Sequence, residues 1–300
     1  LAMLPRVAIG YGNLLPLVEP GAVLLPPPGA QEQRAQYVSV VSIALDTPRI
    51  ESALALVGPV EAVYASSQNL YLASARFASG NIGLPGFRDP ALAITDLHQV
   101  AISGDAMRLV GSGAVEGHLG RNPDLAPLRL DEVDGRLRVV TSSGVQWGGQ
   151  VVNRLSILEP STRVDGLLRT LAVLPNAQRP EPLGKPGEIL YGTRFVDDRL
   201  YAVTFQTIDP LYVVDLANPA DPRIAGSVVL PGFSDYLHPL PGGLLLGVGL
   251  DARQSGNFAL FQGVQLNLFD VRDPAAPAVL QRVLVGKRGS TTALLRHPHA

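Results

Sequence analysis

One polar or ionisable side chain recurs at the same place in several repeating segments of this 300-residue chain. In four segments it stands six residues before the first leucine of a predicted strand, and a match between residues 237–239 and 296–298 adds a fifth case. These residues are Tyr64, Asp131, Arg194, His238 and His297. If the fold brought them together in a partly dehydrated space, burial and mutual charge would shift their pKa values, which suits ligand binding and acid–base chemistry.

The segments that carry these residues repeat a pattern of strand and turn. The clearest copies are Leu211–Pro222 and Leu266–Pro277, which lie 55 residues apart. In each copy a short apolar strand ends in an aspartate, Asp215 or Asp270, and runs into a turn bracketed by prolines. We expect both aspartates to cap these turns by accepting hydrogen bonds from backbone amides. A recurring all-strand unit of this length is typical of a β-propeller.

The expected fold class is therefore all-β, a β-propeller of four-stranded antiparallel blades. Four full blades are predicted over residues 61–111, 128–173, 189–230 and 233–285, and two partial blades over 37–57 and 289–297. Residues 1–36 are predicted to be an irregular lead-in rich in proline and glycine, and residues 37–300 a propeller domain truncated at its C-terminal end. We expect seven or eight blades in the intact protein, as is typical of propellers.

Two insertions interrupt the repeats, and both are expected to form loops on one face of the propeller, where function tends to lie. An ordinary loop that the fold tolerates is the favoured interpretation of each. Residues 142–151 carry the only tryptophan, Trp147, among glycines, and residues 250–262 are polar with two phenylalanines. The predicted strands themselves are apolar almost throughout, and 46% of the chain is apolar. This composition suits sheets that are covered on both faces.

The recurring polar residues have two interpretations in such a fold. If the first strand of each blade is innermost, the five side chains ring the central channel and form a ligand site. Alternatively, they are structural and tie neighbouring blades by buried hydrogen bonds. A ligand site predicts that Arg194→Ala and His238→Ala abolish ligand binding and leave the melting temperature nearly unchanged. A collapse of stability would favour the structural role.

Composition and motifs argue against several functional classes. A net charge of −2 provides no field that would attract nucleic acid. The absence of cysteine excludes disulfides, thiolate nucleophiles and Cys-ligated metals. No apolar run approaches the roughly 18 residues of a membrane span, and neither a Gly-x-Ser-x-Gly elbow nor a phosphate-binding loop is present. His238, His297 and His299 could together form a zinc or copper cluster, but histidines alone are a weak signal, so we predict no metal and no cofactor.

Several segments resemble a known family. They are Tyr191–Phe195, Leu200–Phe205, Asp209–Leu216 and Leu230–Pro239, with further matches over residues 4–7, 63–73 and 131–139. The chain resembles secreted bacterial and archaeal proteins with a C-terminal β-propeller domain, which are distant relatives of WD40 propellers. The resemblance implies an extracytoplasmic protein (secreted, periplasmic or envelope-associated) whose full chain extends at both ends. It implies no particular activity, and the 250–262 insertion has no match in the family pattern.

The expected function is that of a non-enzymatic exported β-propeller. We expect it to bind a protein, a peptide or a cell-envelope ligand, but not nucleic acid, through its loop face or channel mouth. One alternative is a hydrolase or lyase that acts on sugar or peptide, with Asp131, Arg194 and His238 in the central funnel. Another is an architectural spacer domain. An enzyme would need a deep pocket where these side chains surround open space, whereas a binding module needs only a broad exposed patch.

Overall fold

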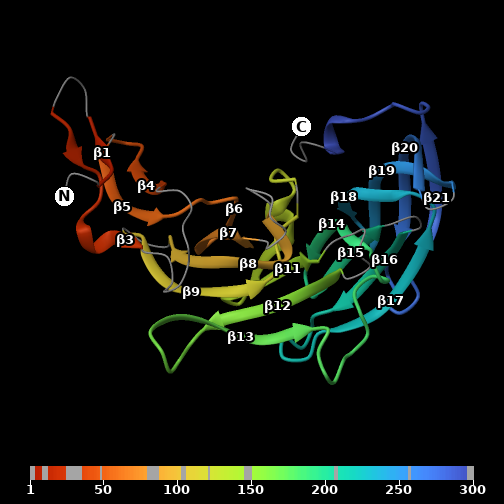
Figure 1. The fold of residues 1–300 in the computed structure, drawn as a ribbon, viewed down its shortest axis with the longest axis horizontal. Helices are drawn as coiled ribbons and strands as arrows, with labels where there is room; N and C mark the ends of the chain where they lie inside the picture. The colour runs from red at the N-terminus through yellow and green to blue at the C-terminus, as the bar shows by residue number, and fades with distance from the viewer. Residues whose placement is uncertain are drawn as a thin grey trace.

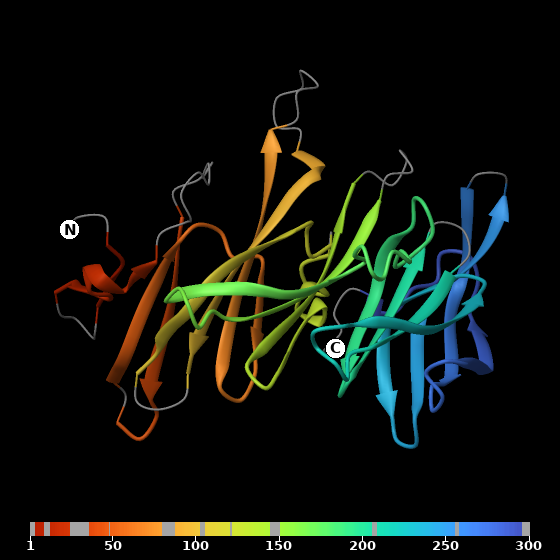
Figure 2. The same cartoon turned by 90° about the horizontal axis from the view of Figure 1, so that it is seen from below.

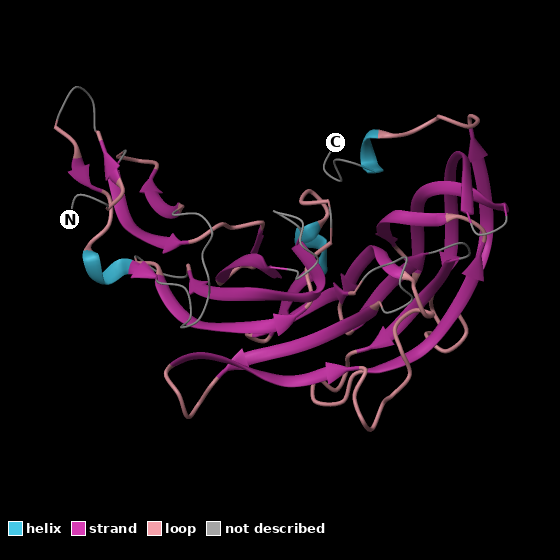
Figure 3. Ribbon diagram, viewed as in Figure 1, coloured by secondary structure: helices cyan, strands magenta, loops and turns pink. Residues whose placement is uncertain are grey.

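The computed structural model describes residues 4–8, 13–24, 36–47, 49–79, 88–102, 106–120, 122–144, 151–205, 209–255 and 258–295. These residues are mostly β-strand (Figure 3). The helical elements among them are short 3-10 turns: η1 (Pro20–Ala22), η2 (Ala126–Arg129) and η4 (Ala293–Leu295). No helix of this described part is long and apolar enough to cross a membrane.

The strands form four successive antiparallel meanders of four strands each, which confirms the predicted propeller blades. The first blade comprises β6 (Ala62–Ala65), β7 (Asn69–Ser79), β8 (Arg88–Ala101) and β9 (Arg108–Glu116). The second comprises β10 (Leu130–Val133), β11 (Arg136–Ser143), β12 (Val152–Pro160) and β13 (Gly166–Leu174). The third comprises β14 (Ile189–Val196), β15 (Arg199–Phe205), β16 (Asp209–Asp215) and β17 (Arg223–Leu230). The fourth comprises β18 (Phe233–Leu240), β19 (Leu244–Ser255), β20 (Phe258–Asp270) and β21 (Ala278–Val285).

The blades follow one another along an arc in chain order (Figures 1 and 2). The first strands β6, β14 and β18 lie on the concave side of this arc, and the last strands β9, β13, β17 and β21 lie on its convex side (Figure 1). The first strand of a blade is therefore the innermost one, as the interpretation of the polar residues as a channel ring requires.

The first two blades touch at their outer edges, where β9 and β13 form a short parallel pair. Gly111 pairs with Gly166, and Ser112 pairs with Leu167. A Cβ atom added at Gly111 would lie 3.1 Å from the Leu167 backbone. Glycine at this position therefore allows the two outer strands to approach each other, and the first two blades together form one eight-stranded sheet.

Apolar side chains from neighbouring blades pack against each other, which explains why so many strands are apolar on both faces. Tyr71 and Leu97 of the first blade share a cluster with Val139 of the second. The third and fourth blades meet through aromatic rings, with the ring centroids of Phe205 and Phe233 4.9 Å apart. Each internal blade has a neighbour on both sides, so polar outward faces are rare there.

The turns follow the sequence prediction. Asp215 accepts a hydrogen bond from the amide of Ala217 at 3.0 Å, and Asp270 accepts one from the amide of Arg272 at 3.1 Å. Both predicted caps are thus confirmed. Asp134 and the glycine after it have positive φ angles of 52° and 74°, which is the hairpin geometry expected of an Asp-Gly pair.

The predicted partial blade over residues 37–57 is a three-stranded sheet in the order β3-β5-β4. Its strands are β3 (Val23–Leu24), β4 (Tyr37–Ala44) and β5 (Arg49–Val57). Within the lead-in, β1 (Arg6–Val7) pairs with β2 (Leu15–Pro16), and β3 pairs in parallel with β5. The lead-in strand β3 therefore extends the three-stranded sheet of the partial blade.

One insertion and the C-terminal segment differ from the expected loop and strand. The described residues of the 250–262 insertion extend β19 and β20, because Ala252 pairs with Phe261 and Arg253 with Leu260 beyond a bulge. Residues 145–150 of the other insertion lie outside the described part of the chain. Trp147 lies outside the described residues. The described part of 289–297 ends in the 3-10 turn η4, which contacts β18 and β19. It pairs with no strand among the described residues, and a β-strand needs such pairing.

Candidate functional site

The four described members of the predicted polar ring all lie on first strands. Tyr64 is on β6, Asp131 on β10, Arg194 on β14 and His238 on β18. The fifth member, His297, lies outside the described residues. Their common position near the concave side agrees with the spacing argument, but a common position does not by itself make a common site.

Tyr64 and Asp131 contact each other across the interface between the first two blades. The Tyr64 hydroxyl donates to Asp131 Oδ1 at 3.3 Å and accepts from the backbone amide of Glu132 at 3.2 Å. Burial raises the pKa values of both side chains, in spite of the opposing charge of Arg138 beside Asp131. This pair therefore links two blades at an interface that is largely shielded from water.

Arg138 continues this link into the third blade. Its side chain is only 5% exposed and lies 3.4 Å from Asp131. It also donates to the carbonyl oxygen of Asp197 at 2.5 Å and lies 3.5 Å from the carboxylate of Asp198. Three successive blades are thus joined by one polar chain, which is the arrangement that a structural role for Tyr64 and Asp131 would need.

Arg194 and His238 are placed differently. His238 is exposed and its Nδ1 lies 3.1 Å from the hydroxyl of Tyr236 on the same strand. Within the described part of the chain, no hydrogen bond or ion pair connects Arg194 or His238 to Tyr64 or Asp131. The ring as a single ligand site remains a prediction.

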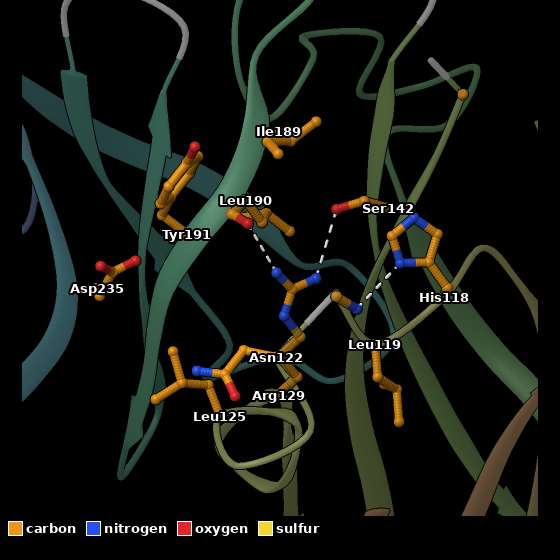
Figure 4. A pocket seen from close by; sticks show the side chains of 12 residues that line it. His118, Leu119, Asn122, Leu125, Arg129, Ser142, Ile189, Leu190, Tyr191 and Asp235 are labelled. Carbon is orange, nitrogen blue, oxygen red and sulfur yellow. Dashed lines mark hydrogen bonds between the residues drawn. The ribbon is translucent and has the colours of Figure 1, made fainter. Parts of the chain in front are cut away.

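A cavity of about 200 Å³ lies further along the same inner strands (Figure 4). Its walls come from the connection between β9 and β10, from the end of β11, and from the starts of β14 and β18. The residues that line it are His118, Leu119, Gly120, Asn122, Leu125, Arg129, Ser142, Gly144, Ile189, Leu190, Tyr191 and Asp235. It is therefore shared by three blades.

Two β-bulges lie where β14 and β18 border this cavity. On β14 the register shifts between Leu190 and Thr193, so that Tyr191 is displaced from regular pairing. On β18 the register shifts between Ser234 and Tyr236, and Asp235 is the displaced residue. Bulges reorient side chains and are common beside functional sites. Both neighbouring first strands thus depart from regular pairing where they border the same cavity.

Arg129 is the cation of the cavity, and it is almost completely buried, with 5% of its surface exposed. It donates to the carbonyl oxygen of Leu190 at 2.7 Å and to the hydroxyl of Ser142 at 3.4 Å, both of which are neutral acceptors. No carboxylate forms an ion pair with it among the described residues. Burial lowers its pKa to about 10, so it remains a cation at neutral pH.

Gly120 packs directly against this guanidinium group. An added Cβ atom at Gly120 would lie 3.0 Å from both Cζ and Nη2 of Arg129, and the backbone there has a φ angle of 96°. The Gly120 amide also donates to Nδ1 of His118 at 3.0 Å. Because Nδ1 is an acceptor, the proton of the neutral His118 ring is on Nε2, which is then a donor.

Asp235 lies across the cavity from His118 (Figure 4). Burial raises the pKa of its carboxyl group to about 7, and no neighbouring charge contributes to this shift. The carboxyl group is therefore close to half-protonated at neutral pH.

The site lacks a recognisable activated nucleophile. The hydroxyl of Ser142 donates to Oδ1 of Asn153 at 2.8 Å and accepts from Arg129. His118 therefore does not act as its base. No group of three His, Cys, Asp or Glu residues in the described segments could hold a metal ion. The arrangement of one cation, one imidazole donor and one carboxyl group is suited to binding a polar ligand.

Sequence reasoning did not identify His118, Arg129 or Asp235. Tyr191 and Asp235 each stand three residues before a predicted ring residue, Arg194 and His238 respectively. This common spacing of three residues was visible in the sequence. Because bulges have no clear sequence signature, nothing indicated that these two positions, and not the ring residues, border a cavity. His118 and Arg129 belong to the connection between β9 and β10, which lies outside the strands on which the repeats were aligned.

Comparison with known proteins agrees with the architecture. A family model described as a β-propeller domain matches residues 2–300. An uncharacterized protein of Methanocaldococcus jannaschii is 35% identical over 166 residues, which is 55% of this chain and 23% of the relative. An uncharacterized protein of Archaeoglobus fulgidus is 34% identical over 175 residues, which is 58% of this chain and 23% of the relative. The aligned region thus covers about a quarter of these archaeal relatives. Since the family model spans nearly every residue, the chain belongs to the β-propeller domain family.

Proposed function

We propose that this β-propeller is a binding module of an exported protein, and that it binds a peptide or another cell-envelope ligand in the cavity between its inner strands. The observation that carries the proposal is a cavity that two bulged first strands border and whose wall holds a buried cation, Arg129. A location outside the cytoplasm is supported by the resemblance to secreted propeller proteins.

Binding is favoured over hydrolysis or lyase chemistry because of the state of the polar groups. The hydroxyl group of Ser142 donates its hydrogen bond to Asn153 and not to His118. Asp235, with its pKa near 7, is the one feature that favours the enzymatic alternative, because a general acid or base works best with a pKa near the working pH. A purely architectural role does not explain why the buried cation Arg129 borders an open cavity.

The test compares the protein with a variant in which the cavity is filled. Ile189→Trp places a large side chain in the cavity wall, and Val229→Trp places the same side chain on the exposed outer strand β17 as the matched control. The probe is a pool of random pentapeptides with free termini, whose binding is measured by equilibrium dialysis and mass spectrometry.

We expect the wild type and Val229→Trp to retain the same subset of peptides and Ile189→Trp to lose it. Equal retention by all three proteins would place binding elsewhere, and no retention by the wild type would remove peptides as the ligand class. Recovery of shortened peptides would favour the hydrolase alternative.

A further inference from the structure

We propose that the cavity recognises a carboxylate group, held by Arg129. The ligand would present either the free C-terminus of a peptide or the carboxylate of a small organic acid. This inference rests on the proposed function and specifies the chemistry of the ligand in the same cavity.

The first argument is the contrast between two equally buried arginines. The side chain of Arg138 is 5% exposed and is accompanied by the carboxylates of Asp131 and Asp198. Arg129 is also 5% exposed, but its described acceptors are a hydroxyl group and a backbone carbonyl. A buried cation without a counter-ion is costly, so an anion from outside the protein would compensate it.

The second argument is the position of the donors. A guanidinium group has five N–H donors in a planar fork that matches the two oxygens of a carboxylate. Two of these donors are used in the bonds to Leu190 and Ser142 (Figure 4). His118 lines the same cavity, where its Nδ1 accepts a hydrogen bond from the Gly120 amide.

The third argument selects a carboxylate over a phosphate. Among the described residues that line the cavity, Arg129 is the only arginine or lysine, and Asp235 is on the wall as well. A single cation balances a monoanion. A phosphate group carries up to two negative charges, and the second would face the carboxyl group of Asp235 without a partner. The planar fork of Arg129 also matches a planar carboxylate.

The experiment uses one N-acetylated pentapeptide, chosen from those that the wild-type protein retains, in two forms. One form has a free C-terminal carboxylate and the other a C-terminal amide, and the dissociation constants are measured by isothermal titration calorimetry. We expect amidation to weaken binding by at least about tenfold, because it removes a charge-assisted hydrogen bond. Equal affinity of the two forms would overturn the carboxylate inference but leave the proposed binding function intact.

A conservative variant tests the role of Arg129. Arg129→Lys keeps the charge but loses the planar fork, and we expect it to weaken the carboxylate form at least about fivefold while leaving the weak amide form unchanged. The matched control is Arg179→Lys, in an exposed pair with Asp221 that does not line the cavity. Unchanged affinity in a folded Arg129→Lys protein would exclude Arg129 as the carboxylate partner.

A final arm separates the two sources of carboxylate. Sodium acetate and sodium benzoate are tested as competitors of the free-acid peptide at constant ionic strength. Competition at millimolar concentration would identify the carboxylate group as sufficient and favour a small acid. Failure to compete, together with the effect of amidation, would identify a peptide C-terminus whose other residues also contact the cavity.

Discussion

Replacing Asp235 by asparagine should stabilise this protein at alkaline pH. The carboxyl group is displaced into the cavity by the bulge on β18, and burial raises its pKa from 3.8 to about 7. Above pH 7 the folded protein must hold a poorly solvated carboxylate, whereas in the unfolded chain the same group is fully hydrated. Asparagine has nearly the same shape and no charge, so it removes this cost.

The sign and size follow from the two pKa values. Below about pH 4 the group is protonated in both states and contributes no difference in stability. Between about pH 4 and pH 7 the unfolded chain binds fewer protons than the folded protein, so wild-type stability falls as the pH rises. The full shift corresponds to roughly 4 kcal/mol, at about 1.4 kcal/mol for each pH unit. Because part of the side chain is open to the cavity, we expect Asp235→Asn to gain about 1–2 kcal/mol at pH 8.

The assay is urea denaturation of both proteins at half-unit steps between pH 4.5 and pH 8.5. The difference between the two free energies of unfolding isolates Asp235, because every other titratable group is present in both proteins. We expect the difference to grow with pH and to level off above about pH 7.5. A difference that stays constant across this range would refute the assignment of a raised pKa to Asp235.

Three further outcomes test the fold and the predicted ring. Tyr64→Phe should lower the free energy of unfolding by about 1 kcal/mol, because it removes the bond to Asp131; an unchanged urea midpoint would show that this tie between blades contributes nothing. Gly192→Ala should cost about 2–3 kcal/mol, because the new Cβ would overlap a backbone carbonyl of the next blade, whereas Gly21→Ala meets nothing within 4 Å and serves as the control. His238→Ala should change the free energy of unfolding by less than about 0.5 kcal/mol, because the side chain is exposed. Any loss of ligand binding by this variant would therefore be assigned directly to the ring. A large drop in melting temperature would contradict the observed exposure.

The repeat pattern alone was enough to predict the blades. Asp215 and Asp270 mark the ends of equivalent strands in two repeats, and both cap the following turn as expected. Apolar strands on both faces predicted neighbours on both sides, and the clusters around Tyr71 and Phe205 are those contacts. These features could be predicted because strand period, turn residues and caps act over a few residues of sequence.

The cavity could be decided only by the tertiary structure. Asp235 and Tyr191 line it where two strands bulge, and a bulge depends on how each strand pairs with its neighbour and not on its own residues. Arg129 lies 61 residues before the carbonyl that it contacts, and whether a cation has a counter-ion depends on which blades meet around it. The charge balance of a buried site is a sum over groups brought together by packing, and no local sequence pattern contains that sum.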